Sequence, residues 1–346
     1  MTALERALEA PKNLVLDEIV RLLACDDDGV WREAFAAARE VKAKYGKTEV
    51  LPRGLIETSN VCAKDCLYCG IRKSNVKVPR YRLSEREVFC CIDEARRRGY
   101  PAVAFQAGEV ESEANTAYYE RLTAYASGRA GVITRPLEVT LSLGEQTEEV
   151  YWRWKAAGAM RYLIRIETSN RELYARIHPA DCSFDRRVDC IRTLKRLGYV
   201  TGTGVMIGLP GQTVEDLARD IVFFGDENVA MAGMGPYVPH PDTPLAGRLK
   251  SNVSRPRLLA LALRMIALTR LYLHDVNIVA ATALEALDPQ RGRLRGIDAG
   301  ANVVMPVLTP EDCREKYDLY PGKVRTKDGS RETSAVADGG EREIAS

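Results

Sequence analysis

The chain has 346 residues, of which 46% are hydrophobic, and its 50 basic and 48 acidic side chains leave a net charge of +2. This length and composition suffice for one large apolar core, whereas the balanced charge gives no reason to expect a nucleic-acid or membrane-surface partner. No apolar run is long enough to span a membrane, and the N-terminus lacks the apolar stretch of a signal peptide. We therefore expect a cytoplasmic protein whose nine cysteines are thiols and not a disulfide framework.

The first fifty residues predict helices. Apolar residues recur at helical spacing over 13–24 and 31–45, and Gly46 suits the end of the second helix. These helices precede the part of the chain that carries the strand patterns. We expect residues 1–49 to form a helical cap on the closed end of the barrel predicted next.

From residue 50 onward, short apolar runs alternate with longer amphipathic stretches. The runs of strand length cover 50–58, 102–106, 137–143, 161–167, 201–207, 231–235, 277–281 and 302–305. The helical patterns cover 84–98, where Ser84 and Glu87 form a capping box, and 113–125, 147–157, 186–197, 214–224 and 255–273. Segments 170–183 and 288–297 are only weakly helical. Alternating strands and helices predict a parallel sheet, and eight strands predict an α/β fold closed into a (β/α)8 TIM barrel over residues 50–323. The polar tail, 324–346, is expected to be disordered.

Three cysteines, Cys62, Cys66 and Cys69, lie on one short loop directly after the first predicted strand, and no fourth cysteine follows nearby in the sequence. A structural zinc site usually needs four ligands, and the nearest histidine is His178. Three thiolates can instead hold three corners of a 4Fe–4S cube and leave one iron open to a small ligand. Because functional residues of a barrel lie at the carboxyl ends of its strands, this loop predicts a reactive cofactor site. The alternative is a zinc knuckle or a set of incidental thiols.

The spacing Cys-x3-Cys-x2-Cys, with Tyr68 before the last cysteine, resembles the radical S-adenosylmethionine superfamily. The resemblance implies a 4Fe–4S cluster whose open iron binds S-adenosylmethionine. It also implies that an electron from the reduced cluster cleaves the sulfonium C–S bond to give a 5′-deoxyadenosyl radical. The protein would then position the substrate and exclude water, while the cofactor performs the chemistry.

Within that superfamily the chain resembles the HydE family, which matures the active-site cluster of di-iron hydrogenase. The motifs that carry the resemblance occur in order at 59–70, 141–145, 165–170, 204–213, 235–245, 300–306 and 319–323. The 3-methylornithine synthase of pyrrolysine biosynthesis is a similar protein with a different reaction. The resemblance implies a small substrate, an iron carbonyl cyanide complex bound to cysteine, with the maturases HydG and HydF as partners and a reduced electron donor.

The resemblance also implies roles for single residues. Glu167 would hold S-adenosylmethionine, and Arg187 would contact its carboxylate, which suits a guanidinium. Arg165 lies on the same strand face as Glu167 and, with Thr282, would serve the substrate. The other residues expected to face the cavity and bind the cofactor are Tyr68, Gln106, Thr140, Ser142, Tyr317 and Tyr320.

Each of these assignments has a structural alternative. Glu167 could cap the following helix, Arg165 could be a paired structural arginine, and Arg187 could be a solvated helix residue. His240, in a proline-rich loop, is interpreted as a loop residue in preference to a catalytic one. The glycines of 201–208 lack the spacing and the helix of a dinucleotide fingerprint and are interpreted as room for the cofactor to approach the backbone.

The chain departs from the HydE pattern at three positions expected to lie on the substrate side. Ala107 replaces a serine, Ile166 replaces a histidine, and Ala281-Thr282 replaces a pair of threonines. Only Cys313 lies where many HydE chains carry cysteines for a second cluster, so one cluster is expected. Because lost polar groups change selectivity, two other hypotheses stay open: a paralogue acting on another amino-acid-like substrate, such as a mutase, and a non-catalytic metal-binding barrel.

Overall fold

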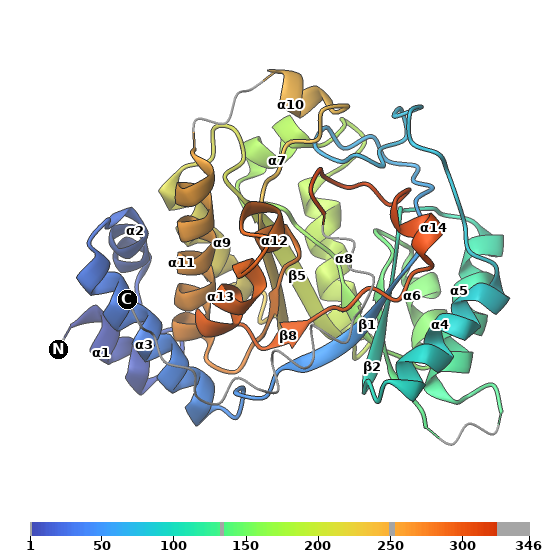
Figure 1. The fold of residues 1–346 in the computed structure, drawn as a ribbon, viewed down its shortest axis with the longest axis horizontal. Helices are drawn as coiled ribbons and strands as arrows, with labels where there is room; N and C mark the ends of the chain where they lie inside the picture. The colour runs from blue at the N-terminus through green and yellow to red at the C-terminus, as the bar shows by residue number, and fades with distance from the viewer. Residues whose placement is uncertain (1, 132–134, 249–252, 324–346) are drawn as a thin grey trace.

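The computed structural model describes residues 2–131, 135–248 and 253–323. Eight parallel strands, each hydrogen-bonded to the next, close into one barrel in chain order (Figure 1). The strands are β1 Leu51–Ser59, β2 Ala102–Ala107, β3 Glu138–Ser142, β4 Ala159–Leu163, β5 Val200–Ile207, β6 Met231–Pro236, β7 Asn277–Ala280 and β8 Val303–Val304. The prediction of a (β/α)8 barrel is therefore confirmed.

Helices surround the barrel. Their bounds are α1 Ala3–Glu9, α2 Leu16–Ala24, α3 Asp28–Lys44, α4 Glu85–Arg97, α5 Glu113–Ser127, α6 Glu148–Ala156, α7 Arg171–Ile177, α8 Phe184–Arg196, α9 Val214–Asp226, α10 Pro244–Arg248, α11 Arg255–Leu273, α12 Ala283–Leu287, α13 Gly292–Asp298 and α14 Glu311–Arg314. The capping box at the start of α4 is confirmed, because Ser84 accepts from the Glu87 amide and Glu87 accepts from that of Ser84. The two weak helical segments, 170–183 and 288–297, contain α7 and all but the last residue of α13.

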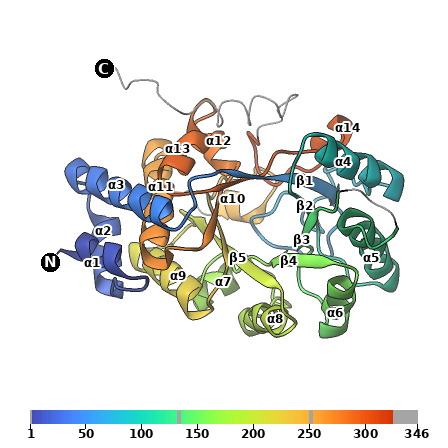
Figure 2. The ribbon, with the colours of Figure 1, turned by 90° about the horizontal axis from the view of Figure 1, so that it is seen from below.

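The N-terminal helices α1–α3 do not lie where we expected them. They pack beside the barrel, α2 against α9 and α3 against α11, and so extend the outer layer of helices on one side (Figure 2). Their apolar side chains, among them Ile19 and Trp31, belong to the same buried cluster as Leu217 and Ile266 of those helices. Burial of these faces against α9 and α11 therefore decides the position of α1–α3, and a cap across the closed end was the wrong expectation.

Side chains alternate between the two faces of each strand, and this alternation places the site. On β2, Val103 and Phe105 point into the core between the strands and helices, so Gln106 points into the barrel. On β3, Val139 and Leu141 belong to the same core, so Thr140 and Ser142 point inward. Gln106 is paired in register with Ser142. The barrel interior is therefore lined by polar groups at the carboxyl ends of the strands.

Strand β4 is shorter than predicted. It ends at Leu163. Beyond it the chain stays hydrogen-bonded to β5, because Ile164 N donates to Gly202 O (3.0 Å) and an isolated bridge joins Glu167 and Val205. Glu167 itself has a φ of 65°, in the left-handed region that a non-glycine side chain seldom adopts. The strand pattern over 161–167 therefore includes a bend that apolar alternation does not reveal.

Among the described helices, none has the length and apolar character needed to cross a membrane. The tail expected to be disordered, 324–346, lies outside the described residues.

Candidate cluster and cofactor site

The loop that carries the three cysteines follows β1 at the carboxyl end of the barrel. Backbone hydrogen bonds hold it from two sides: Leu67 N donates to Ile177 O (2.9 Å), and Gly70 N donates to Leu319 O (3.2 Å). Gly70 has no room for a side chain, because a Cβ there would lie 2.0 Å from Asp318 O. The loop is thus fixed against the end of α7 and the C-terminal segment 315–323.

The thiols of this loop fit an iron–sulfur cluster. Cys62 Sγ accepts hydrogen bonds from the backbone N–H groups of Lys64 (3.4 Å) and Glu109 (3.3 Å), the kind of contact that stabilises a cluster thiolate. Burial raises the pKa of the Cys69 thiol to about 12, so its thiolate needs a bound cation. In the described residues, no three cysteine, histidine or carboxylate side chains converge on one point as a single metal ion requires. A cube spreads three ligands over three irons and so suits three thiols on one loop, whereas a structural zinc site usually takes four ligands.

A fourth cysteine, which the sequence analysis missed, lies beside the loop. Cys182, between α7 and α8, is buried, and its hydrogen bond with the Cys66 thiol, together with burial, raises the pKa of Cys66. Ligands of different irons in one cube stand apart, whereas Cys182 meets the sulfur of Cys66 itself. We therefore do not count Cys182 as a fourth ligand.

Arg165 and Glu167 form a two-pronged ion pair inside the barrel. Arg165 Nε donates to Glu167 Oε1 (2.8 Å) and Nη2 donates to Oε2 (2.9 Å), while the same guanidinium also donates to the carbonyls of Gly233 (3.0 Å) and Val205 (2.9 Å). The Arg165 side chain is 31% exposed and that of Glu167 only 8%. Arg165 is thus a paired arginine, which is the structural alternative that the sequence analysis gave for it.

The glycines of β5 and β6 make room for this arginine. A Cβ on Gly204 would lie 2.7 Å from Arg165 Nη1, and one on Gly233 would lie 3.3 Å from the same atom. The strand β5 runs through the glycines without a helix opening at them, so the dinucleotide fingerprint is excluded. In the structure, Gly204 and Gly233 make room for the side chain of Arg165. That the glycines also let the cofactor approach the backbone stays a prediction.

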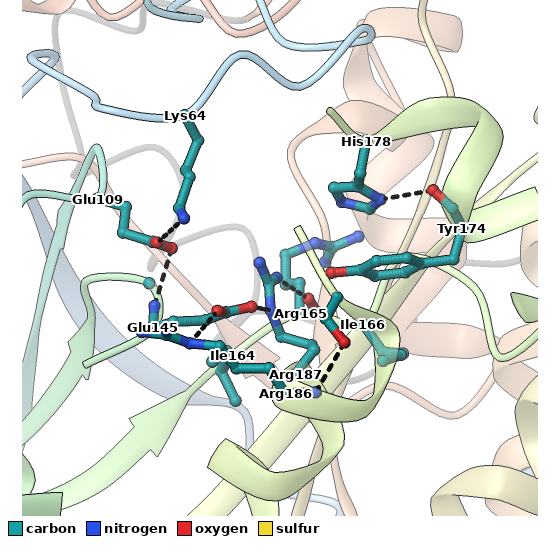
Figure 3. A network of polar contacts seen from close by, with 12 residues as sticks. Lys64, Glu109, Glu145, Ile164, Arg165, Ile166, Tyr174, His178, Arg186 and Arg187 are labelled. Atoms are coloured by element: carbon teal, nitrogen blue, oxygen red, sulfur yellow. Dashed lines mark hydrogen bonds and ion pairs between the residues drawn. The ribbon is translucent and has the colours of Figure 1, made fainter. Parts of the chain in front are cut away.

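Arg187 belongs to a chain of buried charges beside the cysteine loop (Figure 3). Its Nε donates to Glu145 Oε1 (2.6 Å), and its Nη1 donates to the carbonyl of Arg165 (2.6 Å). Glu145 N donates to Glu109 Oε2 (2.8 Å), and Glu109 in turn lies 3.4 Å from Lys64 Nζ. Arg187 is 7% exposed, so the alternative of a solvated helix arginine is wrong.

Glu109, Glu145 and Lys64 were not predicted as site residues. Glu145 lies in the motif 141–145, which was the available signal, and Lys64 lies between two of the loop cysteines. Burial raises the pKa of Glu109, which indicates that its charge depends on the cations around it. The network brings two cations, Arg187 and Lys64, to the cysteine loop, where an anionic group of a cofactor could be bound.

Tyr68 packs against His178 edge to face and makes a 3.2 Å hydrogen bond to its Nε2. His178 Nδ1 lies 3.0 Å from Tyr174 O, which can only accept, so Nδ1 carries the proton and Nε2 accepts from the tyrosine. Burial lowers the pKa of His178 to about 3 and keeps it neutral. His178 therefore orients Tyr68 and is not needed as a metal ligand.

Inside the barrel, Thr140 is buried, and its hydroxyl has no hydrogen-bond partner among the residues that the structure describes. A buried hydroxyl without a partner is costly unless a ligand or water satisfies it. Gln106 and Ser142 are partly buried on the same inward face. These inward-facing polar groups therefore suit a polar ligand.

The C-terminal segment 315–323 crosses to the barrel. Tyr320 hydrogen-bonds to Thr282 through their hydroxyls (2.7 Å), and Lys323 forms an ion pair with Glu57, a buried carboxylate on β1 whose pKa is raised by burial. Tyr317 is 2% exposed, and its ring lies 4.8 Å from Lys323 Nζ. The structure thus brings Tyr320 to Thr282 and Tyr317 to Lys323, and adds Glu57, which the sequence analysis did not select.

The loop residue His240 uses both ring nitrogens within the protein. Nε2 lies 3.1 Å from Asp318 Oδ2, and Nδ1 accepts from the Asp242 amide (3.1 Å). These contacts are those of a structural residue that ties its loop to the segment 315–323.

A separate pocket of about 570 Å³ lies outside the barrel between α2, α9 and α11, and none of the site residues described in this subsection lines it.

Comparison with known proteins agrees with this geometry. The family model of the radical SAM superfamily matches residues 56–224, which contain the cysteine loop, Glu167 and Arg187. This barrel with its three-cysteine loop is thus a radical SAM enzyme, whose cofactors are a 4Fe–4S cluster and S-adenosylmethionine.

Individual relatives identify the family within this superfamily. The chain is 43% identical over 302 residues to the [FeFe] hydrogenase maturase subunit HydE of Thermotoga maritima, covering 87% of this chain and 82% of that one. It is 25% identical over 315 residues to the 3-methylornithine synthase of Methanosarcina barkeri, covering 90% and 85%. The solved structure of methylornithine synthase (PylB) has the same fold, with a TM-score of 0.81 at 22% identity over 97% of this chain and 95% of the other. The chain belongs to the HydE family.

Proposed function

We propose that this protein acts in the assembly of the active-site cluster of [FeFe] hydrogenase, as a radical SAM enzyme with a small substrate. The observation that carries the proposal is the 43% identity to a HydE over 87% of the chain, together with an intact cysteine loop. When bound, the cluster supplies the electron that cleaves S-adenosylmethionine to a 5′-deoxyadenosyl radical. The partners we propose are HydG, which would deliver an iron complex, HydF, which would receive the product, and an electron donor.

The residues of the chain would divide the work as follows. Cys62, Cys66 and Cys69 would hold the cluster. Arg187, already placed by Glu145, would bind the cofactor carboxylate, for which its fork of donors is suited. Glu167, oriented by Arg165, would accept a hydrogen bond from the cofactor.

The substrate would lie deeper in the barrel, against the inward faces of β2, β3 and β7. The sequence analysis assigned Thr140, Gln106 and Ser142 to the cofactor. We propose instead that these inward-facing polar groups serve the substrate. The pair Thr282–Tyr320 would close the opposite side and exclude water.

The departures from the HydE pattern give the paralogue less support than the sequence suggested. Ile166 is fully buried in one apolar cluster outside the barrel, and Ala107 packs against a second such cluster. Neither removes a polar group from the substrate side, so the expectation for these two positions was wrong. Of the three, only Ala281 faces the interior. A Cβ added to Gly235 would lie 3.3 Å from the Cβ of Ala281.

The test is hydrogenase activation in a defined mixture. Reconstituted protein, S-adenosylmethionine and dithionite are combined with HydF, HydG and their substrates, and an apo-hydrogenase is assayed for H₂ evolution. We expect activation with the wild type and none with Cys66→Ala, which lacks one cluster ligand. Cleavage of S-adenosylmethionine without activation would favour the paralogue, and absence of cleavage would favour a non-catalytic barrel.

A further inference from the structure

The stretch that follows the cysteines is strongly basic. Between Cys66 and Ser84 the sequence has five cations and no acidic residue, although the chain as a whole has a net charge of only +2. The cations are Arg72, Lys73, Lys77, Arg80 and Arg82. We call residues 72–82 the basic loop.

Most of these charges reach the surface. Lys73, Lys77, Arg80 and Arg82 are exposed, and Val76, between the two lysines, is 92% exposed. A valine so exposed inside a charged segment is an apolar contact point surrounded by positive charge.

Only part of the charge is neutralised by acidic neighbours. Arg72 pairs with Asp65 (2.6 Å), and Lys77 pairs with Asp242 (2.5 Å). Arg80, in contrast, donates to backbone carbonyls, among them those of Asn60 (2.7 Å) and Ile71 (2.7 Å), and forms no ion pair with a carboxylate of the described residues.

The same contacts make the surface rigid. Asn75 Nδ2 donates to Gly70 O (2.7 Å) and Arg80 Nη2 donates to Asn75 O (3.0 Å), so side chains tie the loop to itself at its centre. A surface that is already ordered loses little conformational entropy when a partner binds.

The basic loop also lies directly on the cluster site. Arg72 N donates to Cys69 O (3.2 Å), and Lys73 N donates to Lys64 O (2.8 Å), between two of the cluster cysteines. The reductive cleavage of S-adenosylmethionine consumes one electron per event, and that electron must enter from outside the protein. The basic loop is therefore the charged surface through which a donor could come close to the cluster.

We propose that the basic loop is the docking surface of an acidic electron-carrier protein that reduces the cluster. One electron passes from the carrier to the cluster, so the carrier is oxidised by one electron and no bond is made or broken. Lys73, Lys77, Arg80 and Arg82 steer an acidic partner by long-range attraction, and Val76 supplies an apolar contact once it has docked.

The experiment measures cluster reduction by a reduced flavodoxin, an acidic one-electron carrier, in anaerobic stopped flow. The variant Lys73→Glu/Lys77→Glu reverses two charges of the loop, and Lys73→Gln/Lys77→Gln only removes them. The matched control, Arg32→Glu/Arg39→Glu, makes the same charge change on two exposed residues of α3, on the other side of the barrel (Figure 1). None of these residues belongs to the proposed catalytic machinery.

At low ionic strength we expect the charge reversal to slow reduction by flavodoxin at least tenfold, the neutral variant to lie between it and the wild type, and the control to stay within twofold. The wild-type rate should fall with added salt more steeply than that of the reversed variant. Reduction by dithionite, and hydrogenase activation with dithionite, should be unchanged in all of them, which separates this proposal from the proposed function.

Three results would overturn the proposal. They are an unchanged flavodoxin rate in the reversed variant, an equal loss in the α3 control, and an equal loss with dithionite. A fourth result, slower hydrogenase activation by the reversed variant with dithionite as the reductant, would overturn it as well, because the loop would then be a docking surface for HydG or HydF.

Discussion

Removing the guanidinium of Arg165 tests the pair at the centre of the barrel. The variant Arg165→Ala deletes both hydrogen bonds to Glu167 and the two to the carbonyls of Gly233 and Val205. It leaves the Glu167 carboxylate, whose side chain is 8% exposed, without its cation. Glu167 also has a φ of 65°, so its backbone conformation depends on contacts such as these.

The expected loss of unfolding free energy follows from how deeply Arg165 and Glu167 are buried. Breaking a fully buried pair costs about 3–5 kcal/mol, and an exposed pair contributes about 0–1 kcal/mol. Because the Arg165 side chain is 31% exposed, water in the cavity can replace part of what is lost. We therefore expect Arg165→Ala to lower the free energy of unfolding by about 2–3 kcal/mol.

A double-mutant cycle with Glu167→Gln measures the interaction itself. Urea unfolding of the wild type, both single variants and the double variant, followed by circular dichroism, should give a coupling energy of about 1–2 kcal/mol. The affinity for S-adenosylmethionine, measured by equilibrium dialysis on the reconstituted protein, should fall in Arg165→Ala because Glu167 is no longer oriented. Additive losses in stability, with cofactor affinity unchanged, would refute the pairing and its proposed role.

Three further predictions concern the surroundings of the site. In Gly108→Ala the added Cβ would lie 2.6 Å from Cys62 Cβ, so we expect reconstitution to give less iron per chain, and a wild-type iron content would contradict the placement of that cysteine. Cys182→Ala removes the thiol beside Cys66 and none of the three loop ligands, so iron content should stay at the wild-type level; a clear loss would make Cys182 a ligand. Burial raises the pKa of Asp220 from 3.8 to about 7, so between these values the folded chain holds a proton that the unfolded chain releases, and stability falls as pH rises. Asp220→Asn should flatten that decline in urea midpoints of the cluster-free protein between pH 5 and 7, and an identical slope in both proteins would show that Asp220 does not cause it.

The fold could be predicted because its signals are local. Apolar runs of strand length and amphipathic helices alternate along the chain, and the eight runs are the eight strands of the barrel. The cysteine spacing was equally direct, since all three thiols lie within one loop. The same local reasoning failed at Glu167, where a bend interrupts the strand pattern without a glycine or proline to mark it.

Contacts between distant segments could not be predicted. Cys182 approaches Cys66, and Lys323 approaches Glu57, only because α7, α8 and the C-terminal segment pack against the barrel. Ile166 was expected on the substrate side, yet it lies on the strand face opposite Arg165 and Glu167, where its side chain packs into the outer core. The position of α1–α3 could not be predicted either. An amphipathic pattern shows that a helix has an apolar face, but it does not show which surface covers that face.

The central claim is that Cys62, Cys66 and Cys69 hold a 4Fe–4S cluster with one iron open to S-adenosylmethionine. The most direct test is low-temperature electron paramagnetic resonance of the anaerobically reconstituted, dithionite-reduced protein, recorded with and without that compound. We predict a signal from the reduced cluster whose shape changes when S-adenosylmethionine is added, and no such signal in Cys66→Ala. A signal that stays the same on addition, or no signal in the reduced wild type, would contradict the account.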